Sequence, residues 1–325
     1  GVFEGQNFIL ADVATASDLS QDTIRVFAHP DGMCVAMPMR GGRTRFIFLV
    51  DKPPAGSEPT HEQCQRIVDE RMGGRWSLGE AFWLTYFEVH HGQVPRYRFD
   101  RVLLAGDAAH IHSPAGGQGM NTGLQDAFNL AWKLAAVTTG NATNDVAEPL
   151  LDSYSLERVP IGQALLESTA LITDYVMNAE NALHTSATFA DTGREIIGRV
   201  QATAITYHDS PLTTPATGDA PPRPGERITR VNAEHATSPA WQALLAHLRR
   251  PGWTLLLLRT PTAPDGPHPR PLHTVRLDDP ALATDLGAPH GGWLLIRPDG
   301  YIAARGDTTT PASGRTAPET SSQPG

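Results

Sequence analysis

The sequence predicts a mixed α+β and α/β fold, in which an antiparallel sheet comes first, long helices follow, and a smaller α/β unit comes last. Three observations support this prediction. Short apolar runs separated by turn residues fill the first hundred residues. Two long segments with helical spacing follow them. Further short apolar runs begin after a stretch rich in Pro, Thr and Gly.

The early strands are expected at residues 7–14, 23–29, 33–40, 44–50 and 77–91. Turn residues at Pro30-Asp31-Gly32 and Gly41-Gly42 connect neighbouring strands over hairpin lengths, which implies antiparallel pairing. A helix is expected over residues 60–72, because apolar residues recur there at helical spacing and Thr60 is a suitable N-cap.

A short apolar strand at residues 101–105 leads into a Gly-Asp pair and a glycine-rich loop. From Gly119 a helix is expected, ending before Gly140. Its apolar residues fall at steps of three and four on one stripe: Met120, Leu124, Ala127, Phe128, Ala131, Leu134 and Ala135. A second long helix is expected over residues 149–178, with a kink or a break at Pro160.

The C-terminal part reads as a smaller unit after a linker rich in Pro, Thr and Gly. A helix is expected at residues 240–248, and strands at 253–258, 273–277, 293–296 and 301–304. Pro298-Asp299-Gly300 predicts the hairpin turn between the last two strands. The predicted divisions are residues 1–98, 99–205, a linker at 206–227, 228–306 and a disordered tail at 307–325.

The overall composition excludes several classes of protein. The formal net charge of -9 argues against a nucleic-acid partner, which normally binds a basic face. No run approaches the ~18 apolar residues of a membrane span, and no signal peptide is visible, so a cytoplasmic protein without a membrane partner is expected. Cys34 and Cys64 form no CxxC pair and are expected to be reduced thiols.

The Gly-Asp loop has the features of a ligand site. Asp107 lies at the carboxyl end of a strand, where its carboxylate can accept hydrogen bonds from a polyol. The glycines before Met120 allow an electron-rich group to approach the N–H groups of a helix end. The alternative is that these glycines only build a tight turn, which Asp107 caps.

Other candidate sites carry less support. His110 and His112 with Asp107 form a weak metal pattern, and no metal site is expected. His90 and His91 are adjacent in a strand and face opposite ways. No GxSxG motif is present. Four aromatic residues could line a phenolic pocket or pack in the core, and strand alternation places at most half on one face: Phe82, Trp83, Tyr86 and Phe87.

The stretch RVLLAGDAAHIHSPAGGQGMNTGLQDAFNLAWKLA at residues 101–135 resembles the second FAD motif of the class A FAD-dependent aromatic hydroxylases. These are the p-hydroxybenzoate hydroxylase-like flavoproteins, and the resemblance extends to their phenol and polyketide hydroxylase branch. QVPRYR at residues 93–98 and ERVP at 157–160 also match the family pattern. Gly92 departs from that pattern, because many relatives carry Arg before this Gln.

The resemblance implies how the residues would act. Asp107 would bond a ribityl hydroxyl of FAD, and Pro114 would lie beside the isoalloxazine with its backbone facing the substrate. The N–H groups at the helix end would meet the pyrimidine edge of the flavin. The implied cofactor-binding set is Gly106, Asp107, Pro114, Gly117, Gly119, Met120 and Asn121. No catalytic side chain is implied, because the flavin carries the chemistry.

The resemblance also assigns the larger parts of the chain. Residues 1–98 would be the substrate-binding sheet and residues 99–205 the C-terminal part of the FAD-binding domain. Residues 228–306 would be a thioredoxin-like domain that lacks CxxC, so a packing role or a homodimer contact is expected there instead of redox chemistry. The GxGxxG segment that binds the ADP half of FAD is absent, so an N-terminally truncated chain that does not retain FAD alone is expected.

The implied activity is that of an FAD-dependent monooxygenase. It would hydroxylate a phenolic or polyketide aromatic substrate with NADPH or NADH and O2, through a C4a-hydroperoxyflavin. One alternative keeps the flavin site but performs a Baeyer–Villiger oxygenation. The other is an inactive fragment that serves as a binding or dimerisation module.

Overall fold

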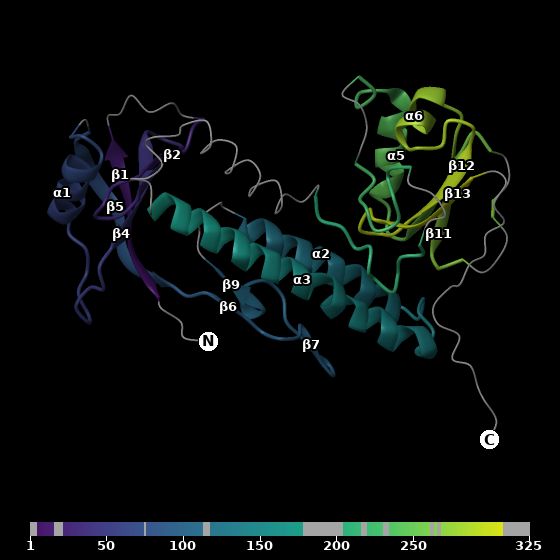
Figure 1. Cartoon of the computed structure of the whole chain (residues 1–325), viewed down its shortest axis with the longest axis horizontal. Coiled ribbons are helices and arrows are strands. Elements are labelled where there is room, and N and C mark those ends of the chain that lie inside the picture. Colours follow the sequence, from purple (N-terminus) through teal and green to yellow (C-terminus); the bar gives the residue numbers. More distant parts are fainter. Residues whose placement is uncertain are drawn as a thin grey trace. The chain divides into compact units, whose positions relative to one another are not determined.

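The computed structural model describes residues 5–15, 22–74, 76–112, 118–177, 204–215, 220–229, 234–260, 263–264 and 268–307 (Figure 1). The chain divides into two units. The first comprises Gly1–Val94, His110–Gly119 and Gln163–Val200, and the second comprises Pro95–Ala109, Met120–Gly162 and Gln201–Gly325.

The first unit contains a five-stranded sheet with the order β2-β3-β4-β1-β5, in which every neighbouring pair is antiparallel. Its strands are β1 (Gln6–Thr15), β2 (Arg25–Phe27), β3 (Cys34–Met39), β4 (Arg43–Val50) and β5 (Leu78–Val89). The expected antiparallel sheet is therefore confirmed. The expected strand at 23–29 is shortened to the three residues of β2.

Helix α1 (His61–Arg71) packs its apolar side against one face of this sheet (Figure 1). The hydroxyl of Thr60 accepts a hydrogen bond from the Gln63 N–H at 3.1 Å, which confirms Thr60 as the N-cap. The core of the unit forms between the buried residues of the helix, among them Ile67 and Val68, and alternate residues of the strands, among them Phe46 and Phe48.

The two thiols lie inside this core, and both cysteines are free. Burial raises the pKa of Cys34 to about 11 and that of Cys64 to about 11, so both remain protonated thiols at neutral pH. Because the thiolate is the reactive form, we expect negligible reaction with a disulfide reagent at pH 8. The measurement is thiol titration with and without urea. Rapid labelling of the folded chain would contradict the prediction.

Strand β5 does not alternate regularly, and this corrects the expectation for its aromatic residues. Its pairing with β1 shifts register, because Asp12 pairs with Trp83 while Val13 pairs with Ala81. Phe82 is thus the extra residue of a β-bulge, and Phe82 and Trp83 are both about half exposed. Neither is a core residue. The guanidinium of Arg43 lies 5.1 Å from the centroid of the Phe82 ring.

Five short elements follow the sheet. They are β6 (Gly92–Gln93), β7 (Arg98–Phe99), β8 (Val102–Leu103), the 3₁₀ turn η1 (Gly106–Ala108) and β9 (His110–Ile111). In the first unit β6 pairs with β9, and in the second unit β7 and β8 form a hairpin. Only two residues of the expected strand at 101–105 are therefore paired.

Helix α2 (Gly119–Thr138) begins where the sequence predicts, but its apolar stripe is not buried. Met120, Leu124 and Phe128 are 77%, 61% and 55% exposed. The buried residues are polar or charged: Thr122, Asp126, Asn129 and Lys133. Within the described residues, α2 thus meets its neighbours in the second unit through hydrogen bonds and ion pairs.

Helix α3 (Asn144–Met177) begins earlier than expected and is not broken at Pro160. The Thr143 carbonyl accepts the N–H groups of Val146 and Ala147, which starts the helix ahead of Pro149. Pro160 removes the N–H that would bond the carbonyl of Leu156. Leu156 is exposed, so this carbonyl belongs to the outer side of the helix, where a lost bond costs least.

The C-terminal part of the second unit is a four-stranded sheet with the order β11-β10-β12-β13. Its elements are α5 (Pro239–Leu248), β10 (Trp253–Leu258), β11 (Leu272–Leu277), α6 (Pro280–Asp285), β12 (Gly292–Ile296) and β13 (Ile302–Asp307). β10 is parallel to β11 and antiparallel to β12. The predicted hairpin turn is confirmed, because the Arg297 N–H donates to the Tyr301 carbonyl.

Of the predicted linker at residues 206–227, the structure describes 206–215 and 220–227, and these residues form no helix or strand. Ile205 and Tyr207 are nevertheless buried against Tyr301, and Ile161 packs on them. The expected disordered tail was placed at residues 307–325, but Asp307 is the last residue of β13. Residues 308–325 lie outside the described residues, as do Pro114 and Gly117.

Candidate functional site

The Gly-Asp pair forms a tight turn directly after β8. Ala105 is extended, and Gly106 follows with a φ of 58°, a conformation that favours glycine. The chain then makes the single 3₁₀ turn η1, closed by a hydrogen bond from the Ala109 N–H to the Gly106 carbonyl at 2.8 Å. This geometry leaves the Asp107 side chain exposed, without a hydrogen bond to any residue the structure describes.

The turn lies against helix α2 at a second glycine. A Cβ added to Gly123 would come within 3.3 Å of the Gly106 Cα, and one added to Gly106 would come within 3.8 Å of the Gly123 Cα. The two backbones therefore approach each other with no side chain between them. Gly123 was not among the predicted site residues. It lies one turn into helix α2, where the absence of a Cβ lets the backbone of the turn come this close.

Two buried charged residues hold the turn in place. The Gly106 N–H donates to Oδ2 of Asp126 at 3.1 Å. Oδ1 of the same carboxylate accepts from Nε of Arg158 at 2.6 Å, and both side chains are inaccessible to solvent. The guanidinium also donates to the Tyr207 hydroxyl at 3.0 Å and to the Thr122 carbonyl at 3.2 Å. Sequence reasoning missed this pair, since charged residues on a helix normally face solvent.

The helix end predicted to meet the flavin is the first turn of α2. A Cβ added to Gly119 would lie 2.7 Å from Nε2 of His112, so a larger residue would clash with this imidazole. Met120 and Asn121 are exposed, and no acidic residue lies in the first turn. The first N–H groups of a helix have no partner within it and carry a partial positive charge, so this end suits an electron-rich ligand.

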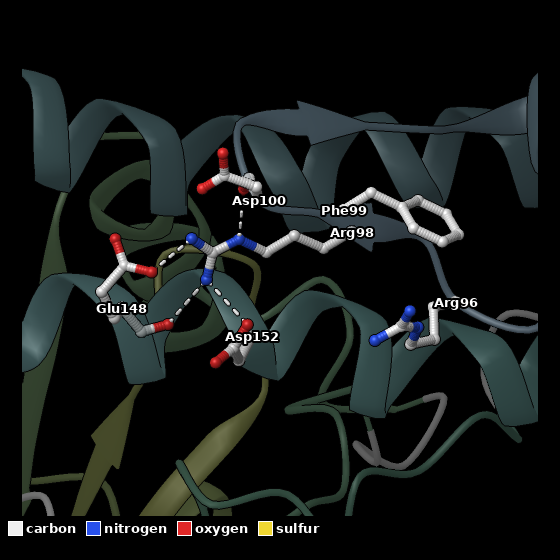
Figure 2. A pocket seen from close by; sticks show the side chains of 6 residues that line it. All are labelled: Arg96, Arg98, Phe99, Asp100, Glu148 and Asp152. Atoms are coloured by element: carbon white, nitrogen blue, oxygen red, sulfur yellow. Dashed lines mark hydrogen bonds and ion pairs between the residues drawn. The ribbon is translucent and has the colours of Figure 1, made fainter.

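The β7–β8 hairpin that leads to the turn is fastened to α3 (Figure 2). Arg98 is buried, and its guanidinium donates to Glu148, Asp152 and the Asp100 carbonyl. Closer to the turn, the Tyr154 hydroxyl donates to the Leu104 carbonyl at 2.7 Å. Contacts with α3 therefore hold the chain at Arg98 on β7 and at Leu104 directly after β8, two residues before Gly106.

An open cleft of about 460 Å³ lies beside this hairpin. Its lining residues are Arg96, Arg98, Phe99, Asp100, Glu148 and Asp152, and Figure 2 shows the Arg98 guanidinium directed at the two acidic side chains. None of the predicted cofactor-binding residues lines it. The Glu148 and Asp152 side chains in this cleft already pair with Arg98, so they hold the hairpin to α3.

The histidines of the loop are not arranged as a metal site. The rings of His110 and His112 are stacked, with centroids 6.3 Å apart, and His110 is buried. Within the described ranges, no group of three or more His, Cys, Asp or Glu residues is placed to hold a metal ion. Similarly, no helix in the described part of the chain combines the length and apolar character needed to cross a membrane.

A second set of buried charges joins the long helices to the C-terminal sheet within the second unit. This buried charge cluster consists of Lys133 on α2, Glu157 on α3, and Arg297 and Asp299 at the β12–β13 turn. Glu157 accepts from Arg297 at 2.6 and 2.9 Å and from Lys133 at 2.7 Å. Sequence reasoning identified the 298–300 turn but not that it carries these charges.

The cluster alters the ionisation of its members. Burial alone would raise the pKa of Glu157, but Arg297 and Lys133 beside it hold that pKa well below its ordinary value. Burial lowers the pKa of Lys133 to about 8, and the attraction of Glu157 opposes this only in part. The buried negative charge of Glu157 is therefore stabilised by its partners, whereas the buried positive charge of Lys133 lowers the stability of the folded protein.

The Gly106–Asp107 turn thus presents an exposed carboxylate, a group that can accept hydrogen bonds from hydroxyl groups. The chain belongs to a family of FAD-binding proteins, because the family model described as "FAD binding domain" matches residues 3–169. It is 37% identical to the 6-methylpretetramide 4-monooxygenase of Streptomyces rimosus, over 94% of this chain and 60% of that protein.

Other relatives are of the same kind. The chain is 32% identical to the pentachlorophenol 4-monooxygenase of Sphingobium chlorophenolicum, over 89% of this chain and 58% of that protein. Among solved structures it is similar to the OxyS anhydrotetracycline hydroxylase of Streptomyces rimosus, with a TM-score of 0.66 and 27% identity over 96% of this chain and 63% of that one. The chain thus spans about three fifths of the length of these relatives.

Proposed function

We propose that this protein is an FAD-dependent monooxygenase that hydroxylates a phenolic or polyketide aromatic substrate, with NAD(P)H as the reductant and O2 as the oxidant. Membership of the FAD-binding family supports the cofactor. The printed names of the relatives, which include a pretetramide and a pentachlorophenol monooxygenase, support the reaction and the substrate class.

The observation that carries the proposal is the Gly106–Asp107 turn. Its glycine conformation presents an exposed carboxylate beside helix α2, and this carboxylate has no hydrogen bond to any residue that the structure describes. An ionised carboxylate can accept two hydroxyl hydrogen bonds, which is what a ribityl chain offers. The described residues therefore fit this part of FAD.

Each residue of the site has a proposed role. Asp107 would bind and orient the ribityl chain, and the first-turn N–H groups from Gly119 to Asn121 would stabilise negative charge at the pyrimidine edge of the ring. Pro114 and Gly117 belong to the same proposal. FAD, when bound and reduced, supplies the activation of O2, and the protein supplies binding, orientation and exclusion of water.

The flavin site is tested by titrating the protein with FAD and with riboflavin, which contains the ribityl chain and ring, and following flavin fluorescence. We expect Asp107→Ala to weaken the binding of both ligands by about ten- to a hundredfold, because a hydrogen bond to a charged group contributes roughly 1.5–3 kcal/mol. Asp209→Ala, which removes another exposed carboxylate, is the matched control. Equal affinities for the two variants would refute the proposed role of Asp107.

The reaction itself is tested by NAD(P)H oxidation in the presence of phenolic and polyketide substrates. A hydroxylated ring in the isolated product supports the proposal. A ring-expanded ester identifies the Baeyer–Villiger alternative instead. Absence of NAD(P)H oxidation by the flavin-loaded protein would favour the binding module.

A further inference from the structure

The Gly106–Asp107 turn is connected by an unbroken series of contacts to the C-terminal part of the second unit. The series begins at the Gly106 N–H, passes through the carboxylate of Asp126 and the guanidinium of Arg158, and reaches the hydroxyl of Tyr207. We call these four residues the turn anchor. Its three hydrogen bonds measure 3.1, 2.6 and 3.0 Å.

The middle of the turn anchor is buried and held by several hydrogen bonds. Asp126 and Arg158 are inaccessible to solvent, so their charges depend on each other for compensation. Nε, Nη1 and Nη2 of Arg158 each donate to a different acceptor, namely Asp126, Tyr207 and the Thr122 carbonyl. The planar guanidinium therefore fixes the carboxylate that holds Gly106.

The outer end of the turn anchor rests on the C-terminal sheet. The ring of Tyr207 packs on that of Tyr301 with centroids 4.3 Å apart, and the Arg297 guanidinium lies 5.2 Å from the Tyr207 ring. The Tyr207 N–H donates to the Gly225 carbonyl at 2.7 Å. Tyr207 is thus placed by residues that follow the end of α3 by 48 positions or more.

We propose that Asp126 and Arg158 are positioning residues for the Gly106–Asp107 turn, and that the C-terminal part of the chain stabilises this turn through Tyr207. The consequence for the cofactor rests on the proposed flavin site. The C-terminal sheet would then control flavin affinity without touching the flavin. This assigns a role to a part of the chain in which sequence analysis found no redox motif.

The test uses Tyr207→Phe, which removes one hydroxyl and keeps the ring packed on Tyr301. Loss of one hydrogen bond to a charged group predicts about tenfold faster amide hydrogen exchange in the peptide containing Gly106. It also predicts about fivefold or greater weakening of FAD and riboflavin binding. Tyr86→Phe is the matched control, because it removes a tyrosine hydroxyl bond to Gln63 in the sheet of the first unit.

The two readouts separate the possible failures. Equal exchange at Gly106 in the Tyr207→Phe and Tyr86→Phe variants would overturn the turn anchor. Riboflavin requires only the ribityl and ring contacts, so if the unaltered protein does not bind riboflavin the proposed flavin site fails, while the exchange comparison still decides the anchor. Asp126→Asn should accelerate exchange further if it folds, and its failure to fold leaves the Tyr207→Phe comparison intact.

Discussion

Replacing Glu157 with Gln is expected to destabilise the protein by about 3–5 kcal/mol, a typical cost of breaking a buried ion pair from one side. Glu157 accepts two bonds from Arg297 and one from Lys133, and all three side chains are almost completely buried. Glutamine keeps the shape and part of the hydrogen bonding but removes the charge. Two cations then remain buried with Asp299 as the only acid of the cluster.

The measurement is the free energy of unfolding from urea titration at pH 7. Glu148→Gln is the matched control, because Glu148 also pairs with an arginine but is 72% exposed. Because Glu148 is solvated and Arg98 keeps its bond to Asp152, this variant should lose only about 1 kcal/mol and unfold at nearly the same urea concentration as the native protein. Similar losses in both variants would show that the cluster does not stabilise the fold.

The second large effect is a rise in stability with pH that depends on Lys133. Its pKa is lowered from 10.5 to about 8 in the folded protein, mainly by burial. Between these two values the unfolded chain binds a proton that the folded chain does not, so the free energy of unfolding increases with pH across this window. The full rise is on the order of 3 kcal/mol, and below pH 8 the cost of the buried charge is present.

Lys133→Met should remove this rise and be no less stable than the native protein at pH 7. Glu157 would keep both bonds to Arg297, together with those from Asn129 and Ser210, so its charge remains compensated. The difference between variant and native protein across pH is the relevant measurement, since other titrating groups cancel. A parallel pH dependence in both proteins would contradict the assignment.

The ionisation of Lys133 can also be followed directly. Lys52 and Lys133 are the only lysines in the sequence, so a chain labelled with carbon-13 at the lysine side chains gives two signals. Lys52 is exposed and serves as the internal reference. The Lys133 signal should titrate near pH 8, and a titration near its ordinary value would show that burial does not dominate.

The secondary structure was largely predictable, because it depends on local patterns. Alternating apolar residues and turn residues identified the antiparallel sheet, and Thr60 identified the start of α1. Errors occurred where tertiary contacts change the pattern. The bulge at Phe82 turned two neighbouring aromatic residues outward, and the Thr143 carbonyl started α3 ahead of Pro149.

For the candidate site, the sequence identified the residues of the turn but not those that hold it. Asp107 and Gly106 stand out because a Gly-Asp pair after a strand is a local signal, and Asp107 remains a prediction for flavin contact. Asp126 and Arg158 lie in stretches that match the family pattern, but as helix residues each was expected to face solvent. Only their juxtaposition, 32 positions apart in sequence, shows that they form one buried pair.

The sequence by itself therefore determined the order of sheet, helices and α/β unit, the Gly-Asp turn and the family resemblance. Each of these depends on residues that lie close together in the sequence. Only the tertiary structure decided which face of α2 is packed. Met120, Leu124 and Phe128 are exposed, while Asp126 and Lys133 are buried. The physical reason is that a buried charge is tolerated only beside its counter-charge, and those partners come from distant parts of the chain.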